Sequence, residues 1–213
     1  MEIKKSAIKG GVYLVIDPSS ELTTLKTKLL AALESGVAVI QIWNHWQAGQ
    51  NKKQTIEEVG KLASPFGVPV LINEDWKLMQ DCPVLDGVHF DQVPANMDEI
   101  SASLKKPFFC GITCSNDLST VMWAVENKLD YVSFCSMFPS SSAGSCEIVM
   151  PENVVRTKEI TDIPVFVAGG LTPENVAALK ENIPFDGIAV ISGVMSSDKP
   201  GEKVTAYLNA LKK

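Results

Sequence analysis

Two glycine-containing turns near the C-terminus hold the backbone groups best suited to bind a phosphate. One apolar run, residues 163–168, leads directly into Gly169 and Gly170. The next apolar run ends at Ser192 and Gly193. Glycine lets the backbone approach an anion, and amide groups at the start of a helix can donate hydrogen bonds to it. Because the turns after strands seven and eight of a (βα)8 barrel commonly bind phosphate, these two turns together predict a phosphate cup.

Polar side chains at other predicted strand ends could meet a substrate, because barrel enzymes carry their reacting groups there. Gln41 interrupts an apolar strand, so its amide either bonds a neighbouring strand or binds a ligand, and the sequence leaves both open. Asn73 follows an apolar strand and is either a turn residue or a ligand group. His89 lies between apolar neighbours, where a lone histidine is more often a hydrogen-bonded core residue than a catalyst. The strand ends also carry Asp17, Trp43, His45, Asp91 and Thr113.

Acidic side chains after the third predicted strand suggest a magnesium site. Glu74 and Asp75 are adjacent there, and Mg²⁺ usually takes one or two carboxylates together with substrate phosphates. Asp75 has an alternative role, because a carboxylate also stabilises the N-terminus of a helix. A zinc site is a second hypothesis, although the short ligand spacing typical of zinc sites is missing. Its ligands would be His45, His89, Cys114 and Cys135.

The composition indicates which kinds of molecule the protein binds. The formal net charge is −6 and the sequence pI is about 5.0, which argues against binding to nucleic acid or to an anionic membrane surface. Small anionic substrates remain compatible, because a local cup of amides needs no global positive charge. The five cysteines form no Cys-x-x-Cys pair and the chain has no apolar stretch of 18 residues, so we expect a cytoplasmic protein with reduced thiols. Whether it forms a homo-oligomer is left open.

Short apolar runs rich in β-branched residues alternate with helix-like segments along the whole chain. Runs without polar alternation are typical of parallel strands that are buried on both faces. Eight such units in 213 residues favour a closed (βα)8 barrel, one domain over residues 1–213, rather than an open doubly wound sheet. We predict strands at 12–16, 37–42, 68–72, 85–90, 108–113, 131–134, 165–168 and 188–191. We predict helices at 22–35, 56–66, 76–80, 97–104, 118–127 and 204–211, and two more that begin at 151 and 173.

The order and spacing of several short motifs resemble one family of compact barrels, thiamine phosphate synthase and its relative thiazole tautomerase. The resemblance extends from about Tyr13 to Met195. It rests on Tyr13–Asp17, Val39–Gln41, Leu71–Asn73, Asp86–Gln92, Asp130–Val132, Phe138–Ser140, Val167–Leu171 and Gly187–Ser192.

The resemblance implies an activity and a set of site residues. Enzymes of this family couple hydroxymethylpyrimidine diphosphate to hydroxyethylthiazole phosphate and release diphosphate, with Mg²⁺ on the leaving group. Gln41 and Asn73 would meet the pyrimidine, and Thr113 would act beside the diphosphate. Trp43, His45 and His89 would line the substrate site, with Glu74 and Asp91 as metal ligands. The thiazole phosphate would be held by Ser140, Ser141, Ser142, Gly169, Gly170, Ile191 and Ser192.

The chain departs from the family pattern on the diphosphate side. An arginine and a lysine of the family are replaced by Trp43 and His45. The second metal aspartate is replaced by Pro94, with Asp91 nearby, and a lysine of the sixth strand's loop is replaced by Ala143. The turns that would hold a single phosphate keep the family pattern.

Three functional hypotheses follow from this uneven match. The first is a thiamine phosphate synthase-like enzyme. The second is a non-catalytic or regulatory barrel that binds a thiazole phosphate without turning it over. The third is an enzyme like thiazole tautomerase, although the histidine of that enzyme is replaced here by Ser115.

Overall fold

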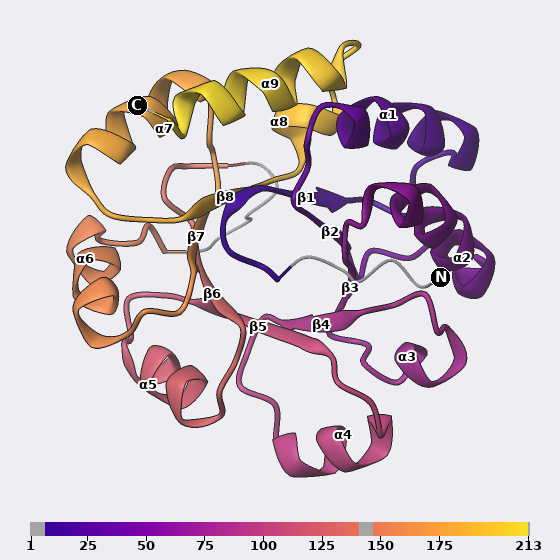
Figure 1. The fold of residues 1–213 in the computed structure, drawn as a ribbon, viewed down its shortest axis with the longest axis horizontal. Helices are drawn as coiled ribbons and strands as arrows, with labels where there is room; N and C mark the ends of the chain where they lie inside the picture. The colour runs from indigo at the N-terminus through magenta and orange to yellow at the C-terminus, as the bar shows by residue number, and fades with distance from the viewer. Residues whose placement is uncertain (1–6, 141–146, 213) are drawn as a thin grey trace.

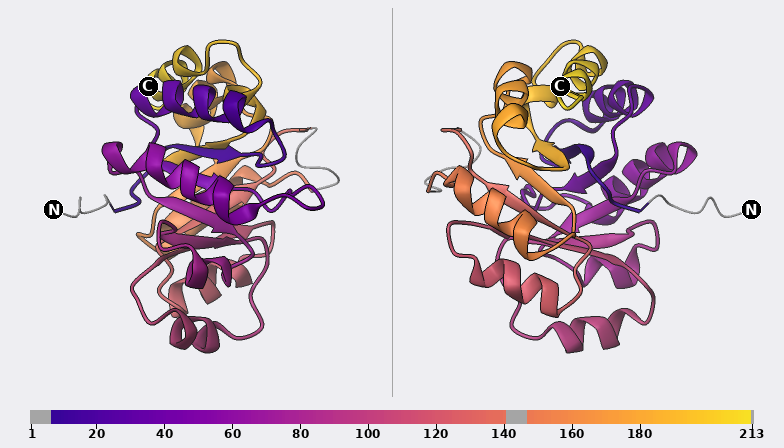
Figure 2. Two further views of the ribbon diagram at one scale, coloured as in Figure 1. Left: turned by 90° about the vertical axis from the view of Figure 1, so that its right-hand side faces the viewer. Right: turned by 60° about the vertical axis from the view of Figure 1, so that its left-hand side comes forward.

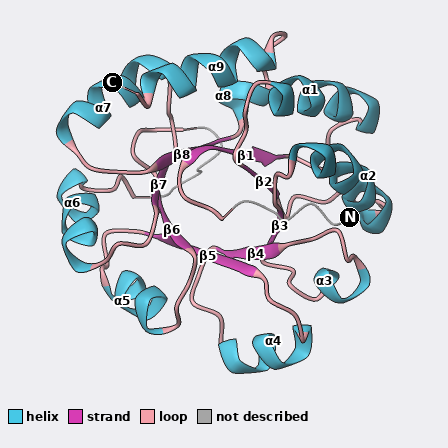
Figure 3. Ribbon diagram, in the orientation of Figure 1, coloured by secondary structure: helices cyan, strands magenta, loops and turns pink. Residues whose placement is uncertain are grey.

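Eight parallel strands close into a barrel in sequence order, with helices around the outside (Figures 1 and 3). The computed structural model describes residues 7–140 and 147–212. The predicted (βα)8 barrel is therefore confirmed. The strands are β1 (Gly11–Ile16), β2 (Val39–Ile42), β3 (Val70–Asn73), β4 (Gly87–Phe90), β5 (Phe109–Cys114), β6 (Tyr131–Cys135), β7 (Val165–Ala168) and β8 (Gly187–Val190). The helices are α1 (Leu22–Glu34), α2 (Lys52–Ala63), α3 (Leu78–Asp81), α4 (Met97–Leu104), α5 (Ser119–Glu126), α6 (Pro151–Ile160), α7 (Pro173–Asn182), α8 (Ser192–Met195) and α9 (Pro200–Ala210), with a 3₁₀ turn, η1 (Ser64–Phe66), after α2.

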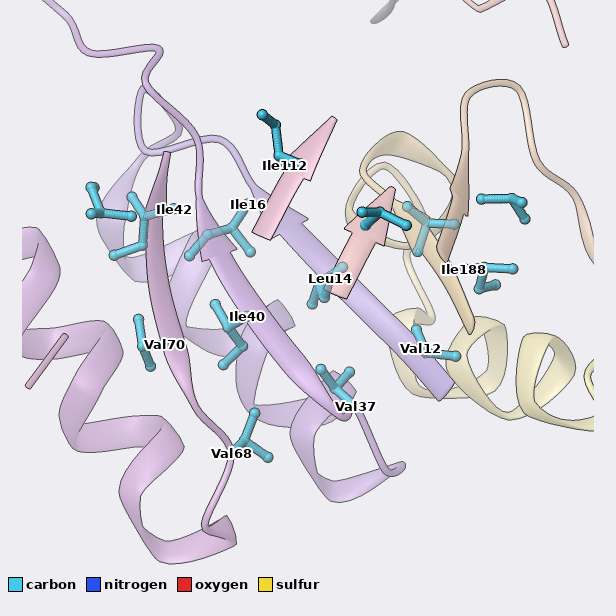
Figure 4. Packing of buried hydrophobic residues seen from close by; sticks show 14 of the residues in the cluster. Val12, Leu14, Ile16, Val37, Ile40, Ile42, Val68, Val70, Ile112 and Ile188 are labelled. Carbon is cyan, nitrogen blue, oxygen red and sulfur yellow. The ribbon is translucent and has the colours of Figure 1, made fainter. Parts of the chain in front are cut away.

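The larger apolar core lies between the strands and the helices. Val12, Leu14 and Ile16 alternate along β1 and pack in one cluster with Leu25 and Leu29 of α1. Figure 4 shows these three β1 residues together with their counterparts on other strands, and the side views of Figure 2 show helices along the outside of the strands. Full burial of each such side chain contributes about 1.5–3 kcal/mol, so this layer supplies most of the hydrophobic stabilisation.

A second, smaller core fills the barrel interior and is aromatic. Tyr13, Tyr131 and Phe166 come from β1, β6 and β7, and their rings meet edge-to-face with centroids 5.6, 5.5 and 5.4 Å apart. Side chains from strands on different sides of the barrel can meet only inside it. Glycines on neighbouring strands make room for these rings: a Cβ at Gly111 would lie 2.1 Å from Tyr131 Cζ, and one at Gly187 would lie 2.4 Å from Phe166 Cε1.

Local signals explain where the helices begin. Thr172 caps α7 through a capping box with Asn175, and Pro173 is the first helical residue, as the sequence predicts. Helix α2 starts earlier than predicted because the Asn51 side chain accepts a hydrogen bond from Gln54 N and so caps it. Helix α8 is absent from the sequence prediction, since its single turn is too short to show a period. None of the described helices is long and apolar enough to cross a membrane.

Candidate active site

The predicted polar residues of strands two to five converge inside the mouth of the barrel. The sheet register pairs Asn73 with His89 across β3 and β4, and it pairs Thr113 with Ser133 across β5 and β6. Because side chains alternate between the two faces of a strand, Gln41, Asn73, His89 and Thr113 all point inward. The barrel therefore brings together four residues that lie far apart in the sequence.

Five of the interior side chains form a continuous hydrogen-bonded chain, which we call the interior polar chain. The Tyr13 hydroxyl donates to Gln41 Oε1 at 2.6 Å and lies 2.8 Å from the Tyr131 hydroxyl. His89 Nδ1 lies 2.8 Å from the Tyr131 hydroxyl, and His89 Nε2 lies 2.9 Å from Thr113 Oγ1. Gln41 and His89 are thus hydrogen-bonded interior residues, which is one of the two roles left open for Gln41 and the commoner role for a lone histidine.

Burial keeps the interior polar chain uncharged near neutral pH. Desolvation lowers the pKa of His89 to about 3, because the surrounding interior disfavours the charged imidazolium. Desolvation also raises the pKa of Tyr13 and Tyr131 well above the usual value for a phenol. An uncharged imidazole has one N–H donor and one nitrogen acceptor, so His89 donates a hydrogen bond to one of its two neighbours and accepts one from the other.

A second group, at the ends of β3 and β4, links Asn73, Glu74 and Asp91 by hydrogen bonds. The Asn73 side chain donates to Asp91 Oδ1 at 3.1 Å and accepts from Asn44 N at 3.3 Å. Glu74 has a left-handed backbone, with φ of 62°, and its Oε1 accepts a hydrogen bond from Asp91 N. Partial desolvation raises the pKa of Asp91 although the bond from Asn73 lowers it. A left-handed non-glycine residue costs of order 1–3 kcal/mol, which the packing around Glu74 must offset.

The two carboxylates fit a magnesium ion better than a zinc ion. Mg²⁺ commonly binds to one or two carboxylates and completes its shell with water and substrate phosphates, so Glu74 with Asp91 is a suitable donor pair. The zinc hypothesis is wrong: in the described part of the chain, no three or more His, Cys, Asp or Glu side chains gather to hold a metal. Cys114 follows Thr113 on β5 and so points outward into the apolar core, where burial raises its pKa to about 12.

The loop after β2 carries Trp43 and His45, which stand where the resemblance would place two cations. His45 Nδ1 lies 3.0 Å from Asp17 Oδ2, and its ring centroid lies 4.9 Å from that of Trp43. One lysine lies in the same region: Lys52, the first residue of α2, pairs with Asp75 at 3.2 Å. Asp75 therefore pairs with a lysine in this structure. The acidic residue that is hydrogen-bonded to Glu74 is Asp91.

The turns after β7 and β8 are the two turns in which the sequence predicts a phosphate cup. Gly169 and Gly170 have φ values of 88° and 62°, a region that favours glycine. A Cβ on Gly170 would lie 2.6 Å from the carbonyl oxygen of Pro139, so the first turn packs tightly on the loop after β6. No described residue accepts a hydrogen bond from the amides of Gly170, Ser192 and Gly193.

A buried tyrosine holds the two turns next to each other. The Tyr207 hydroxyl donates to the carbonyl oxygen of Leu171 at 2.7 Å. A Cβ on Gly193 would lie 2.3 Å from the same hydroxyl and 3.6 Å from Leu171 O. Ile191, the residue before α8, is half-buried. Of the three serines predicted in the loop after β6, Ser140 is half-buried, whereas Ser141 and Ser142 lie outside the described residues.

Sequence reasoning missed two members of the site, Tyr13 and Tyr131. Tyr13 belongs to a strand that is apolar on both faces, and Tyr131 to a strand whose apolar run is broken by Ser133 alone, so the sequence gives little indication of which side chains face the interior. The register supplies that information. Tyr13 lies opposite Val39, and Val39 is two residues before Gln41 on β2, so Tyr13 is on the same inward face as Gln41. The glycine at 111, opposite Tyr131, was the available signal that a large side chain fills the space there.

A polar cleft of about 470 Å³ opens elsewhere, beside the N-termini of α1 and α2. Ser19, Gln47, Gln50 and Asn51 are among its lining residues, and none of the interior polar chain reaches it. It is therefore separate from the site inside the barrel mouth.

Comparisons with known proteins agree with this architecture. The family model of thiamine monophosphate synthase matches residues 12–194. A thiamine-phosphate synthase of Thiobacillus denitrificans is 30% identical over 203 residues, which cover 95% of this chain and 94% of that protein. A thiamine-phosphate synthase of Xylella fastidiosa is 28% identical over 92% of this chain and 82% of its own. The fold matches a solved thiamine phosphate pyrophosphorylase from Pyrococcus furiosus with a TM-score of 0.78 at 20% identity, over 95% of each chain. With most of its length matched by the family model, the chain belongs to the thiamine monophosphate synthase family.

Proposed function

We propose that the protein is a transferase that joins hydroxymethylpyrimidine diphosphate to hydroxyethylthiazole phosphate to give thiamine phosphate. The thiazole nitrogen forms a bond to the methylene carbon of the pyrimidine, and the bond between that carbon and the diphosphate oxygen breaks. The electron pair of the broken bond leaves with diphosphate, so atoms and charge balance. The observation that carries the proposal is the meeting, at one barrel mouth, of polar strand ends and two glycine-rich turns.

The turns after β7 and β8 would bind the thiazole phosphate. The amides of Gly170, Ser192 and Gly193 donate to no partner within the described residues, and an oxyanion would complete their hydrogen bonds. Gly169 supports the same turn, and Ile191 would contact the apolar part of the substrate. Ser140 to Ser142 would add hydroxyl donors from the loop after β6.

The polar strand ends would bind the pyrimidine. Gln41 and Asn73 would hydrogen-bond its ring, with His89 behind them in the interior polar chain. Thr113 would lie at the reacting end, next to the diphosphate. Trp43 and His45, at an aromatic centroid distance of 4.9 Å, would form one side of the diphosphate region.

Glu74 and Asp91 would hold Mg²⁺, which would neutralise part of the charge that develops on the departing diphosphate. The protein itself supplies fewer cations here than the family pattern requires, and Lys52 is engaged with Asp75. This shortage favours a second candidate function, a barrel that binds thiazole phosphate without turning it over. It also predicts a stronger dependence on Mg²⁺ if the protein is an enzyme.

Calorimetric titration distinguishes the two functions. The protein is titrated with hydroxyethylthiazole phosphate, and then with hydroxymethylpyrimidine diphosphate and Mg²⁺, while thiamine phosphate is measured by chromatography. Binding of both substrates with formation of product supports the transferase. Binding of the thiazole phosphate alone, with no product, supports the binding protein and rules out the transferase.

A further inference from the structure

The first link of the interior polar chain has a defined direction. The Tyr13 hydroxyl oxygen lies 2.6 Å from Gln41 Oε1. Bonds of the O–H···O type span roughly 2.5–3.0 Å, whereas N–H···O bonds span roughly 2.7–3.2 Å. In the structure Gln41 turns its carbonyl oxygen, not its amide nitrogen, toward Tyr13, and the short distance suits an O–H···O bond. A carbonyl oxygen only accepts, so Tyr13 must donate.

The direction of this first hydrogen bond fixes the direction of each later one, because each group in the chain has a single proton to donate. Tyr13 has used its proton on Gln41, so it accepts from Tyr131 across 2.8 Å. Tyr131 then accepts from His89, which must carry its proton on Nδ1. His89 Nε2 is left without a proton, and it accepts from the Thr113 hydroxyl across 2.9 Å.

We propose that the interior polar chain runs in one direction, from Thr113 to Gln41, and that Tyr13 and Tyr131 are positioning residues that fix His89 as its Nδ1–H tautomer. Water cannot substitute in the middle of the chain, because Tyr13 and Tyr131 are 1% and 0% exposed. The two ends of the chain are the groups nearest the barrel mouth. The inner links thus determine what the ends can offer to a ligand.

The two ends have opposite hydrogen-bonding character. The Thr113 proton points inward to His89, so its oxygen can only accept from a ligand. The Gln41 carbonyl oxygen accepts from Tyr13, and no described residue accepts from its amide nitrogen, so Gln41 presents N–H donors to a ligand. A ligand must therefore present an N–H or O–H group to Thr113 and an unprotonated nitrogen or an oxygen to Gln41. This step rests on the proposed function: the amino group of the pyrimidine would be the donor to Thr113, because the oxygens of the neighbouring diphosphate only accept.

The tautomer can be measured directly, since the chain has only two histidines. In long-range ¹H–¹⁵N spectra of the full-length protein at neutral pH, an unprotonated Nε2 gives correlations to both ring protons and a shift distinct from that of a protonated nitrogen. The variant His45→Gln assigns the signals of His89. We expect Nδ1 to carry the proton. A protonated Nε2 would reverse the chain and overturn the proposal.

A variant tests whether the tyrosines impose the tautomer. Tyr131→Phe removes the acceptor of His89 Nδ1, so we expect the proton to move to Nε2, where Thr113 can accept it. The matched control is Tyr207→Phe, which removes another buried tyrosine hydroxyl and should leave the His89 signals unchanged. If His89 keeps its Nδ1 proton in Tyr131→Phe, the tyrosines do not position it. Tyr13→Phe serves as the second variant, with partial loss of the Nδ1–H form expected.

The ligand end of the proposal is tested by comparing two affinities. In Tyr131→Phe, Thr113 would accept from His89 Nε2, so its own proton would point toward the ligand instead of away from it. We expect this reversal to weaken binding of hydroxymethylpyrimidine diphosphate about tenfold, the effect of one lost hydrogen bond. Binding of hydroxyethylthiazole phosphate should be unchanged. Equal weakening of both ligands would indicate general structural damage and contradict the proposal. If the unmodified protein binds no pyrimidine diphosphate, the proposed function fails, and the tautomer measurement still decides the direction of the chain.

Discussion

The two halves of the barrel mouth are built from different parts of the chain. At β7 and β8 the groups proposed to bind phosphate are backbone amides, beside the left-handed Gly169 and Gly170 and the hydrogen bond from Tyr207 to Leu171 O. At β2 to β5 they are side chains, and nearly every one is held by another side chain or by a loop amide. Figure 1 shows the two halves on opposite sides of the ring of strands.

The difference explains why only one half keeps the family pattern. A backbone amide offers the same donor whatever side chain it carries, so a phosphate cup at β7 and β8 needs only glycine where the backbone requires it. Side-chain sites change with each substitution, and here Trp43 and His45 stand where the resemblance would place two cations. The new side chains form pairs of their own, such as His45 with Asp17, instead of leaving positive charge for a diphosphate.

The largest effect on ligand affinity is expected for Gly170→Ala, a substitution in the half of the mouth that uses backbone amides. The new Cβ would lie 2.6 Å from Pro139 O, so the turn must move and its amides with it. We expect affinity for hydroxyethylthiazole phosphate to fall by about 100-fold, equivalent to about 2.7 kcal/mol, as measured by calorimetry. Gly49→Ala is the matched control, since Gly49 also has a positive φ of 78° but nothing within 4 Å. Equal losses in both variants would show that backbone strain, not the cup, is responsible.

A smaller and more selective effect is expected for Glu74→Gln in the side-chain half. The glutamine oxygen can still accept from Asp91 N, so the loop keeps its shape while the site loses one negative charge. We expect Mg²⁺-dependent binding of the pyrimidine diphosphate to weaken at least about tenfold, with thiazole phosphate affinity unchanged. Asp75→Asn removes an equal charge next to it and is the control. A similar loss in both variants would indicate a general field effect instead of metal ligation.

The acid sensitivity of the protein tests the interior polar chain. The pKa of His89 is lowered to about 3 in the folded state, against about 6.5 in an unfolded chain. Between these values the unfolded state binds a proton that the folded state does not, so stability falls as the pH drops below about 6.5. The slope approaches about 1.4 kcal/mol per pH unit, and urea unfolding measures it. This part of the slope should vanish in His89→Gln and persist in His45→Gln, and no difference between the two would argue that His89 titrates normally.

The smallest effect is expected at the replaced diphosphate clamp. His45 is exposed and pairs with Asp17 at the surface, where such pairs contribute about 0.2–1 kcal/mol. A double-mutant cycle of Asp17→Asn and His45→Gln, measured by urea unfolding, should give a coupling energy below about 1 kcal/mol. A larger coupling would mean that the pair is a structural element of the mouth and not a substitutable surface contact.

Much of the fold follows from local patterns. The continuous apolar runs at 12–16 and 165–168 indicated parallel strands buried on both faces, and Thr172 with Pro173 indicated the start of α7. Boundaries that depend on a side-chain cap without a strong pattern, such as Asn51 before α2, were set too late. The order of the residues also predicted which strand ends would carry polar groups, because all parallel strands end at the same side of the barrel.

By itself, the sequence determined which residue types stand at each strand end and where glycine frees the backbone, since these depend only on neighbours along the chain. Only the tertiary structure decided that Tyr13 meets Tyr131, 118 positions later, and that both link Gln41 to His89. When both faces of a strand are buried, its sequence pattern is the same on either face. Closure of the barrel selects the interior face, and with it the direction of the hydrogen bonds that reach the mouth.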